Sequence, residues 1–187
     1  MGFLNKNELK EIGFKELGQN VFISSKASIY NAERISIGDN VRIDDFCVLS
    51  AGNEGIKIGR NVHVAVFSSL IGAEKITLGD FSNISSRVAI YSSSDDYSGA
   101  SMTNPTIPDE FKNVHSESVR IGRHVIIGSG SVILPGIVIE DGCAIGALSL
   151  VNKSCKKFGL YSGIPAKFLK ERAQGFLTLE KEFLNRV

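Results

Sequence analysis

Tryptophan is absent from this sequence, and proline and cysteine are scarce, with four and three residues among 187. Cys47, Cys143 and Cys155 are odd in number and far apart, so they form neither a CxxC pair nor the spacing of a zinc site. We therefore expect reduced thiols in a cytoplasmic protein, with Cys47 and Cys143 packed in its interior.

An excess of either charge is also missing, because 21 Lys and Arg residues are balanced by 20 Asp and Glu residues. This balance gives no reason to expect nucleic acid or an anionic membrane as a partner. No apolar run approaches the ~20 residues of a membrane-spanning helix. The polar start, MGFLNKNELKEIG, lacks the apolar core of a signal peptide.

The chain does have a regular period of six. In its C-terminal half the aliphatic residues that fall six positions apart are Ile121, Ile127, Ile133, Ile139, Ile145 and Val151. The same spacing occurs within residues 17–35, 37–49, 58–76 and 78–90. A helix repeats near 3.6 and a plain strand at 2, whereas a short strand followed by a tight turn would repeat at six.

Three such units would close one triangular coil with the marked aliphatic residues inside. The glycine that often follows the aliphatic residue is expected to give each corner its permissive backbone. The sequence thus predicts an all-β fold, a parallel β-helix over residues 17–165. An ordinary β-sandwich is the alternative, which the unbroken hexads disfavour.

Three segments of the predicted single domain, residues 1–187, fall outside the repeat. Residues 1–16 form a predicted helical cap, with a helix at 5–12 closed by Gly13, and residues 166–187 a C-terminal helix. Helices at both ends would cover the open edges of the β-helix. The third segment is a polar inserted loop at about 92–118, which begins with YSSSDDYSG, and a loop of this length is usually functional.

The hexads, the loop and the closing stretch IGALSLVNKSCKKFGLYSGIPAKFLKER together resemble the left-handed β-helix, hexapeptide-repeat acyltransferases. The resemblance covers about residues 20–172. It implies a left-handed β-helix and a homotrimer with active sites between neighbouring subunits. It also implies acyl-CoA as co-substrate along the C-terminal coils, no metal requirement, and a hydroxyl or amine acceptor, commonly on a sugar.

The same resemblance indicates the residues that contact acyl-CoA. Ser129, in IIGSGS, matches a small residue whose backbone N–H lies near the thioester, and Ala147 matches a backbone contact to the pantetheine arm. Lys153 matches the basic residue that closes the Ala147 coil. Lys167 and Lys170 match basic residues that approach the phosphates of CoA. A solvated surface is the alternative for the three lysines.

The acceptor side departs from the sugar O-acetyltransferase pattern at two positions. Counting hexads from Leu78 places the family's catalytic histidine on Asp95, and an acceptor-binding asparagine on Ala65. A histidine suits a hydroxyl acceptor, whose proton must leave during attack. An amine on a sugar is partly neutral near pH 7 and needs a carboxylate to orient it and take a proton.

This pattern resembles the nucleotide-linked amino-sugar N-acyltransferases, in which an aspartate and a serine ten residues earlier replace the histidine. It implies that Asp95 is catalytic and that Asp96 and Ser85 assist it. The alternatives are an Asx-type turn for both aspartates and a capped turn for Ser85.

The three histidines leave two other functions open. His63 is expected to face outward beside Ala65 and to contact the substrate, His115 lies at the far end of the inserted loop, and His124 occupies a corner. A general base at His63 or His115 would favour an O-acetyltransferase acting on a sugar hydroxyl. A metal-dependent trimer, similar to a carbonic anhydrase, would need all three histidines on one zinc ion. The favoured hypothesis is an acyl-CoA-dependent N-acyltransferase acting on a nucleotide-linked amino sugar.

Overall fold

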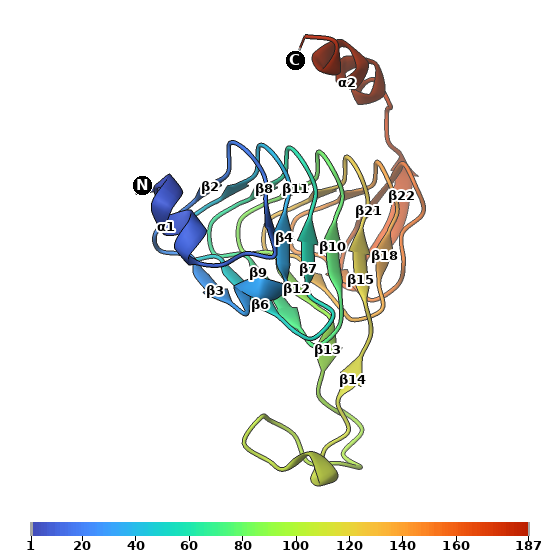
Figure 1. The fold of residues 1–187 in the computed structure, drawn as a ribbon. Helices are drawn as coiled ribbons and strands as arrows, with labels where there is room; N and C mark the ends of the chain where they lie inside the picture. Colours follow the sequence, from blue (N-terminus) through green and yellow to red (C-terminus); the bar gives the residue numbers. More distant parts are fainter. Residues whose placement is uncertain (1, 187) are drawn as a thin grey trace.

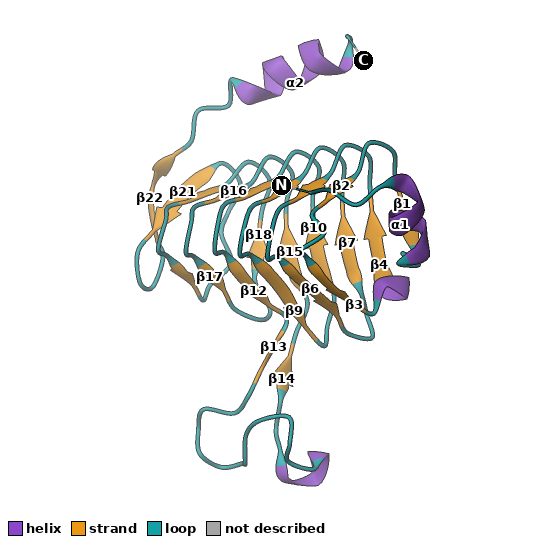
Figure 2. Ribbon diagram, turned by 90° about the vertical axis from the view of Figure 1, so that its left-hand side faces the viewer, coloured by secondary structure: helices purple, strands orange, loops and turns teal. Residues whose placement is uncertain are grey.

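The computed structural model describes residues 2–186, and most of them wind into a triangular parallel β-helix (Figures 1 and 2). Sheet 1 consists of β1 (Glu16–Leu17), β4 (Ile35–Ile37), β7 (Ile56–Ile58), β10 (Ile76–Leu78), β15 (Val119–Ile121) and β18 (Val138–Ile139). Sheet 2 consists of β2 (Phe22–Ile23), β5 (Arg42–Ile43), β8 (His63–Val64), β11 (Asn83–Ile84), β16 (Ile126–Ile127), β19 (Ala144–Ile145), β21 (Gly159–Ser162) and β22 (Lys167–Glu171). Sheet 3 consists of β3 (Ser28–Tyr30), β6 (Val48–Ala51), β9 (Ser69–Gly72), β12 (Ala89–Tyr91), β17 (Val132–Ile133) and β20 (Leu150–Val151).

Each coil passes through sheets 1, 2 and 3 in that order, and equivalent strands of successive coils pair in parallel. Each coil has three turns between its strands. We call the turn from sheet 1 to sheet 2 the first corner, the turn from sheet 2 to sheet 3 the second corner, and the turn from sheet 3 to sheet 1 the third corner. The inward residues include Ile23, Ile43, Leu70, Ile84 and Ile127, and all five are fully buried. Burial of each such side chain stabilises the fold by about 1.5–3 kcal/mol. The predicted fold class, an all-β parallel β-helix, is confirmed.

The expected role of the repeat glycines is wrong. Gly38, Gly59 and Gly79 do not have positive φ; that conformation occurs two residues later, at Asn40, Asn61 and Phe81. The glycines are instead positions of close approach between coils. A Cβ atom at Gly38 would lie 2.8 Å from the carbonyl oxygen of Gly59 in the next coil.

The N-terminal end is covered by α1 (Lys6–Glu11), close to the predicted helix at 5–12. Asn5 caps it, because its side chain accepts hydrogen bonds from the backbone N–H groups of Asn7 and Glu8. The Glu8 side chain accepts a hydrogen bond from the backbone N–H of Asn5 and completes a capping box. Leu9 packs into the end of the core.

The predicted helix at 166–187 is wrong in its first part. Lys167–Glu171 is strand β22, antiparallel to β21, and within residues 166–186 only α2 (Phe176–Leu184) is helical. Residue 187 lies outside the described residues. The parallel part of sheet 2 ends at β21. The N–H and C=O groups on the outer edge of β21 bond to a returning strand, and this pairing outweighs the helical pattern of the side chains. Among residues 2–186, no helix is long and apolar enough to cross a membrane.

The inserted loop forms an arm that projects from the third corner, away from α2 (Figure 1). At its base β13 (Ser93–Ser94) pairs antiparallel with β14 (His115–Ser116). The short 3₁₀ helix η2 (Asp109–Phe111) lies near its tip, and a second, η1 (Ala32–Arg34), precedes β4. The expectation of a loop at about 92–118 between two coil runs agrees with these bounds.

Candidate functional site

Four predicted site residues lie at the second corner in successive coils. The Ala65 N–H donates to the Ile84 carbonyl (2.8 Å), and the Ser85 N–H donates to the Ile127 carbonyl (3.0 Å). One coil further, the Leu148 N–H donates to the Ser129 carbonyl at 2.9 Å. Ala65, Ser85, Ser129 and Ala147 therefore form one column, with the predicted acceptor residues toward the N-terminal coils and the predicted CoA residues toward the C-terminal coils.

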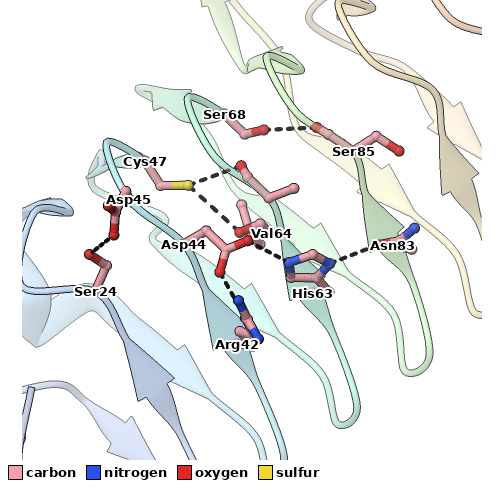
Figure 3. A network of polar contacts seen from close by, with 11 residues as sticks. Ser24, Arg42, Asp44, Asp45, Cys47, His63, Val64, Ser68, Asn83 and Ser85 are labelled. Carbon is pink, nitrogen blue, oxygen red and sulfur yellow. Dashed lines mark hydrogen bonds and ion pairs between the residues drawn. The ribbon is translucent and has the colours of Figure 1, made fainter. Parts of the chain in front are cut away.

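Beside this column, His63 is held in a polar row that crosses three strands of sheet 2 (Figure 3). Its Nε2 lies 2.8 Å from Asp44 Oδ2, and its Nδ1 lies 3.2 Å from Asn83 Oδ1. Asp44 also accepts a hydrogen bond from Arg42 Nε at 2.8 Å. The imidazole is thus oriented from both sides, and both ring nitrogens have partners.

The carboxyl group of Asp44 is ionised in this environment. Burial alone would raise its pKa, but the hydrogen bonds from Arg42 and His63 outweigh that effect and hold the pKa below its ordinary value. Asp44 and Asn83 were not predicted as site residues. Asp44 occupies the position that follows an inward residue, where Gly128 and Gly146 stand in the later coils. A carboxylate in place of a hexad glycine is visible in the sequence and could have indicated Asp44 as a site residue.

Asp95 and Asp96 lie at the base of the arm and differ in environment. Asp95 is exposed and lines a pocket of ≈ 370 Å³ with Tyr91, Leu134 and Pro135 of the third-corner coils. Asp96 turns toward its own loop, where it accepts bonds from the backbone N–H groups of Ser98 (2.7 Å) and Ser101 (3.1 Å). Hydrogen bonds from Ser98 hold the pKa of Asp96 below its ordinary value. These hydrogen bonds order the arm. They are the bonds of an Asx-type turn, which is the alternative to a catalytic role for Asp96.

Ser85 and Asp95 lie at different corners of the same coil. Ser85 follows inward Ile84 at the second corner, whereas Asp95 follows inward Ile90 and the third corner. Six residues of extended chain separate equivalent positions on adjacent corners, which corresponds to about 15–20 Å. Sheet 3 lies between them, so the Ser85 and Asp95 side chains of one copy of the chain are too far apart to contact the same substrate atom.

The predicted CoA-binding lysines divide between corners in a similar way. Lys167 pairs in register with Ser162, at the second-corner end of β21, and Lys170 pairs with Leu160 further back on the same strand. Lys153 follows inward Val151 at the third corner. The second-corner column and Lys167 thus share one edge of the β-helix, and Asp95 and Lys153 share another.

The three histidines lie in three separate places. His63 is on sheet 2, His115 is on β14 opposite Ser94, and His124 is at the first corner, where its Nε2 lies 2.8 Å from Glu180 of α2. Within residues 2–186, no group of three His, Cys, Asp or Glu side chains is arranged to hold a metal ion. The arrangement of the histidines does not fit the zinc constellation of the carbonic-anhydrase-like alternative.

The sequence and fold were compared with known proteins. The bacterial transferase hexapeptide (six repeats) family model matches residues 118–153. The dTDP-4-amino-4,6-dideoxy-D-glucose acyltransferase of Escherichia coli is 55% identical over 183 residues, which cover 98% of this chain and 95% of that protein. The maltose O-acetyltransferase of Clostridium difficile, at 20% identity and a TM-score of 0.61, covers 91% of this chain and 78% of that chain and shares the fold.

The crystal structure of AntD, an N-acyltransferase from Bacillus cereus, has a TM-score of 0.95 and 46% identity to this chain, with 99% of this chain and 98% of that chain covered. That structure contains dTDP-4-amino-4,6-dideoxyglucose and coenzyme A, and the protein carries a serine substitution. A further AntD structure carries a substitution of an aspartate ten positions after that serine. With this fold and more than half of its residues identical to a relative covered almost end to end, the chain belongs to the hexapeptide-repeat acyltransferase family.

Proposed function

We propose that this protein transfers an acyl group from acyl-CoA to the amino group of a dTDP-linked 4-amino-4,6-dideoxy sugar, for use in cell-surface glycans. The observation that carries the proposal is the 55% identity, over nearly the whole chain, to an acyltransferase acting on that nucleotide sugar. The departure from histidine at Asp95 supports the same acceptor, because an amine needs a carboxylate more than an imidazole. Since both substrates are soluble metabolites of the cytoplasm, the proposed location is cytoplasmic.

The active enzyme is proposed to be a homotrimer with its sites between copies. The outward side chains of sheet 3 are mostly apolar and include Val48, Ile71, Ala89, Val132, Leu134 and Leu150. Those of sheet 1 are mostly polar and include Glu16, Ser36, Lys57, Thr77 and Arg120. This difference supports sheet 3 as the covered face of an assembly. The separation of Ser85 from Asp95 supports a site that takes Ser85 from one copy and Asp95 from its neighbour.

In the proposed reaction, the neutral amine of the sugar attacks the thioester carbonyl. A carbon–nitrogen bond forms, the carbonyl oxygen gains negative charge, and backbone N–H groups near Ser129 stabilise that charge. Asp95 holds the amine and accepts its proton as the tetrahedral species collapses. The carbon–sulfur bond breaks, and the proton leaves with the sulfur of CoA. Ser85 orients the amine, and Ala147, Lys153, Lys167 and Lys170 are proposed to hold the CoA.

His63 is proposed to shape the acceptor pocket next to Ala65, without acting as a general base. Its Nδ1 and Nε2 already contact Asn83 and Asp44, so neither nitrogen is free to accept a proton from a sugar hydroxyl. This arrangement disfavours the O-acetyltransferase alternative.

The purified protein is to be tested with acetyl-CoA and dTDP-4-amino-4,6-dideoxyglucose, with release of free CoA measured and the product mass determined. The matched control acceptor is dTDP-6-deoxyglucose, which carries a hydroxyl in place of the amine. We expect turnover of the amino sugar alone. Acylation of the hydroxyl acceptor without turnover of the amino sugar would overturn the proposal.

A further inference from the structure

A column of two cations and two aromatic rings continues the second corner toward the N-terminus. It consists of Lys26, Phe46, Phe67 and Arg87, each the third residue after an inward position in four consecutive coils, and we call it the corner ladder. The rings of Phe46 and Phe67 stack with centroids 5.0 Å apart and planes inclined by 11°. Lys26 Nζ lies 5.3 Å from the Phe46 centroid, and Arg87 Cζ lies 5.8 Å from the Phe67 centroid.

The ladder residues are exposed and conformationally unfavourable. Phe46 is 47% exposed and Phe67 is 51% exposed, and their φ angles are +60° and +63°. A bulky side chain in this left-handed region costs about 1–3 kcal/mol, whereas asparagine tolerates it. At the first corner of the same two coils, Asn40 and Asn61 occupy the equivalent position with φ of +56°. Solubility and stability would both favour asparagine, so another property accounts for the rings.

The ladder lies in line with the proposed reaction site. Arg87 follows Ser85 by two residues in the same coil, and Phe67 and Phe46 lie one and two coils further toward the N-terminus. Coils stack about 4.8 Å apart, so the ladder extends about 10–15 Å from the position of the reacting amine. The proposed CoA-binding residues, Ser129 and Ala147, lie on the opposite side of Ser85.

Along the second corner, the side chains of the corner ladder come in the same order as the chemical groups of a nucleotide sugar that they would bind. From the amine outward, such an acceptor presents a sugar, an anionic diphosphate and then a flat base. From Ser85 outward, the corner presents the guanidinium of Arg87 and then the rings of Phe67 and Phe46. Among residues 2–186 the contact of the Arg87 guanidinium is with the Phe67 ring and not with a carboxylate, whereas Lys26 is already paired with Asp45 at 3.3 Å. The guanidinium of Arg87, which no carboxylate of the described residues neutralises, therefore lies where the diphosphate would pass.

We propose that the corner ladder binds the nucleoside diphosphate of the acceptor, with the diphosphate on Arg87 and the base against the exposed edges of the Phe67 and Phe46 rings, whose faces are covered by each other and by the two cations. Guanidinium groups suit phosphate oxygens, and the electropositive edge of an aromatic ring packs against the face of a second flat ring. This inference rests on the proposed function, because it assigns the nucleotide part of the same acceptor. The other possible occupant is a second copy of this chain, which would cover the rings as part of a subunit contact.

The experiment titrates full-length protein with dTDP alone by calorimetry and compares wild type with Phe67→Asn and Arg87→Asn. Asparagine suits the left-handed backbone, so both variants should melt at or above the wild-type temperature. We expect Phe67→Asn to lower dTDP affinity about 2- to 10-fold, as for the loss of an edge-to-face ring contact. Arg87→Asn should lower it about tenfold and weaken its dependence on salt. In turnover assays the KM for the nucleotide sugar should rise while the KM for acyl-CoA stays at its wild-type value.

Phe22→Leu is the matched control, because Phe22 is 50% exposed but lies on the face of sheet 2 outside the corner. It should bind dTDP like the wild type. Wild-type dTDP affinity in both ladder variants, or no dTDP binding by the wild type, would overturn the inference. A change in sedimentation without a change in dTDP affinity would identify the ladder as a subunit contact and would also overturn it. If dTDP binds as expected but no amino sugar is acylated, the proposed function fails and the nucleotide site stands.

Discussion

The division of the proposed site between copies can be tested by mixing two inactive variants, Ser85→Ala and Asp95→Asn. Each substitution removes one of the two groups that are proposed to contact the acceptor amine and leaves the other in place. A hydrogen bond joins heavy atoms about 3 Å apart, so two groups on one amine lie within ~6 Å of each other. The 15–20 Å between adjacent corners is too far for this within one chain, at about 3.3 Å per residue of strand.

The expected activity of the mixture follows from symmetry. In a ring of three copies every contact is head-to-tail, so each site takes Ser85 from one copy and Asp95 from the next. After random assembly of equal amounts, each of these two residues is intact with a probability of one half. About a quarter of all sites should then be wild type. If both residues came from one chain, every site would lack one of them.

The two variants are to be unfolded, mixed and refolded together, and turnover per chain is compared with that of wild type treated in the same way. Wild type mixed equally with Ser85→Ala serves as a control, because about half the sites remain intact under either arrangement. A variant mixture that stays at the activity of its parents, while the control mixture gives half, would refute a site shared between copies.

Three further predictions concern the β-helix itself. Leu70→Ala should lower the free energy of unfolding by about 2–5 kcal/mol in chemical denaturation, because Leu70 is fully buried. The control Leu148→Ala, at a side chain that is 70% exposed, should change the free energy of unfolding by less than about 0.5 kcal/mol. Asp44→Asn should destabilise by about 1.5–3 kcal/mol at pH 7. Because the pKa of Asp44 in the folded protein lies below the ordinary 3.8, the difference in stability between wild type and Asp44→Asn should be full above pH 3.8 and be lost as the pH falls through the folded pKa. A difference in stability that persists in acid would contradict this prediction. Burial raises the pKa of Cys47 to about 11 and that of Cys155 to about 12, so a disulphide reagent at pH 8 should leave native thiols unmodified and react with all three in denaturant.

The hexads predict much of the fold and part of the site, because a fixed period converts sequence spacing into spatial register. Ala65, Ser85, Ser129 and Ala147 could be placed near one another in this way, since each follows an inward aliphatic residue by one or two positions. The row from Asp44 to His63 escaped prediction because a coil here is longer than three hexads. Extra residues at the third corner separate Ile43 from Val64, so counting in sixes loses the pairing.

Two other features could not be predicted because no repeat constrains them. The arm has no inward position, so its projection from the third corner depends on the short pairing of Ser93–Ser94 with His115–Ser116. Strand β22 has helical side-chain spacing but is exposed along its length, so its conformation depends on the edge that β21 presents. In both cases backbone pairing with a distant segment overrides the local pattern.

The distribution of glycine indicates where this β-helix can carry chemistry. At the first corner the residue after the inward position is Gly18, Gly38, Gly59, Gly79 and Gly122 in five successive coils, and a Cβ atom at any of them would meet the next coil within 3 Å. This position of the first corner has no room for a side chain in those coils. At the second corner Gly128 and Gly146 keep the same rule in the C-terminal coils, where the proposed contacts to CoA come from the backbone. The N-terminal coils carry Asp44, Ala65 and Ser85 at this position instead. Where the glycine is replaced, the backbone hydrogen bond to the next coil is kept, at 2.8 Å for Ala65 and 3.0 Å for Ser85, and the coil gains a side chain. The coils with such a replacement are those proposed to bind the acceptor. In the proposed site the donor half therefore uses backbone groups beside glycines, and the acceptor half uses side chains, which is where a substitution would change the substrate without changing the fold.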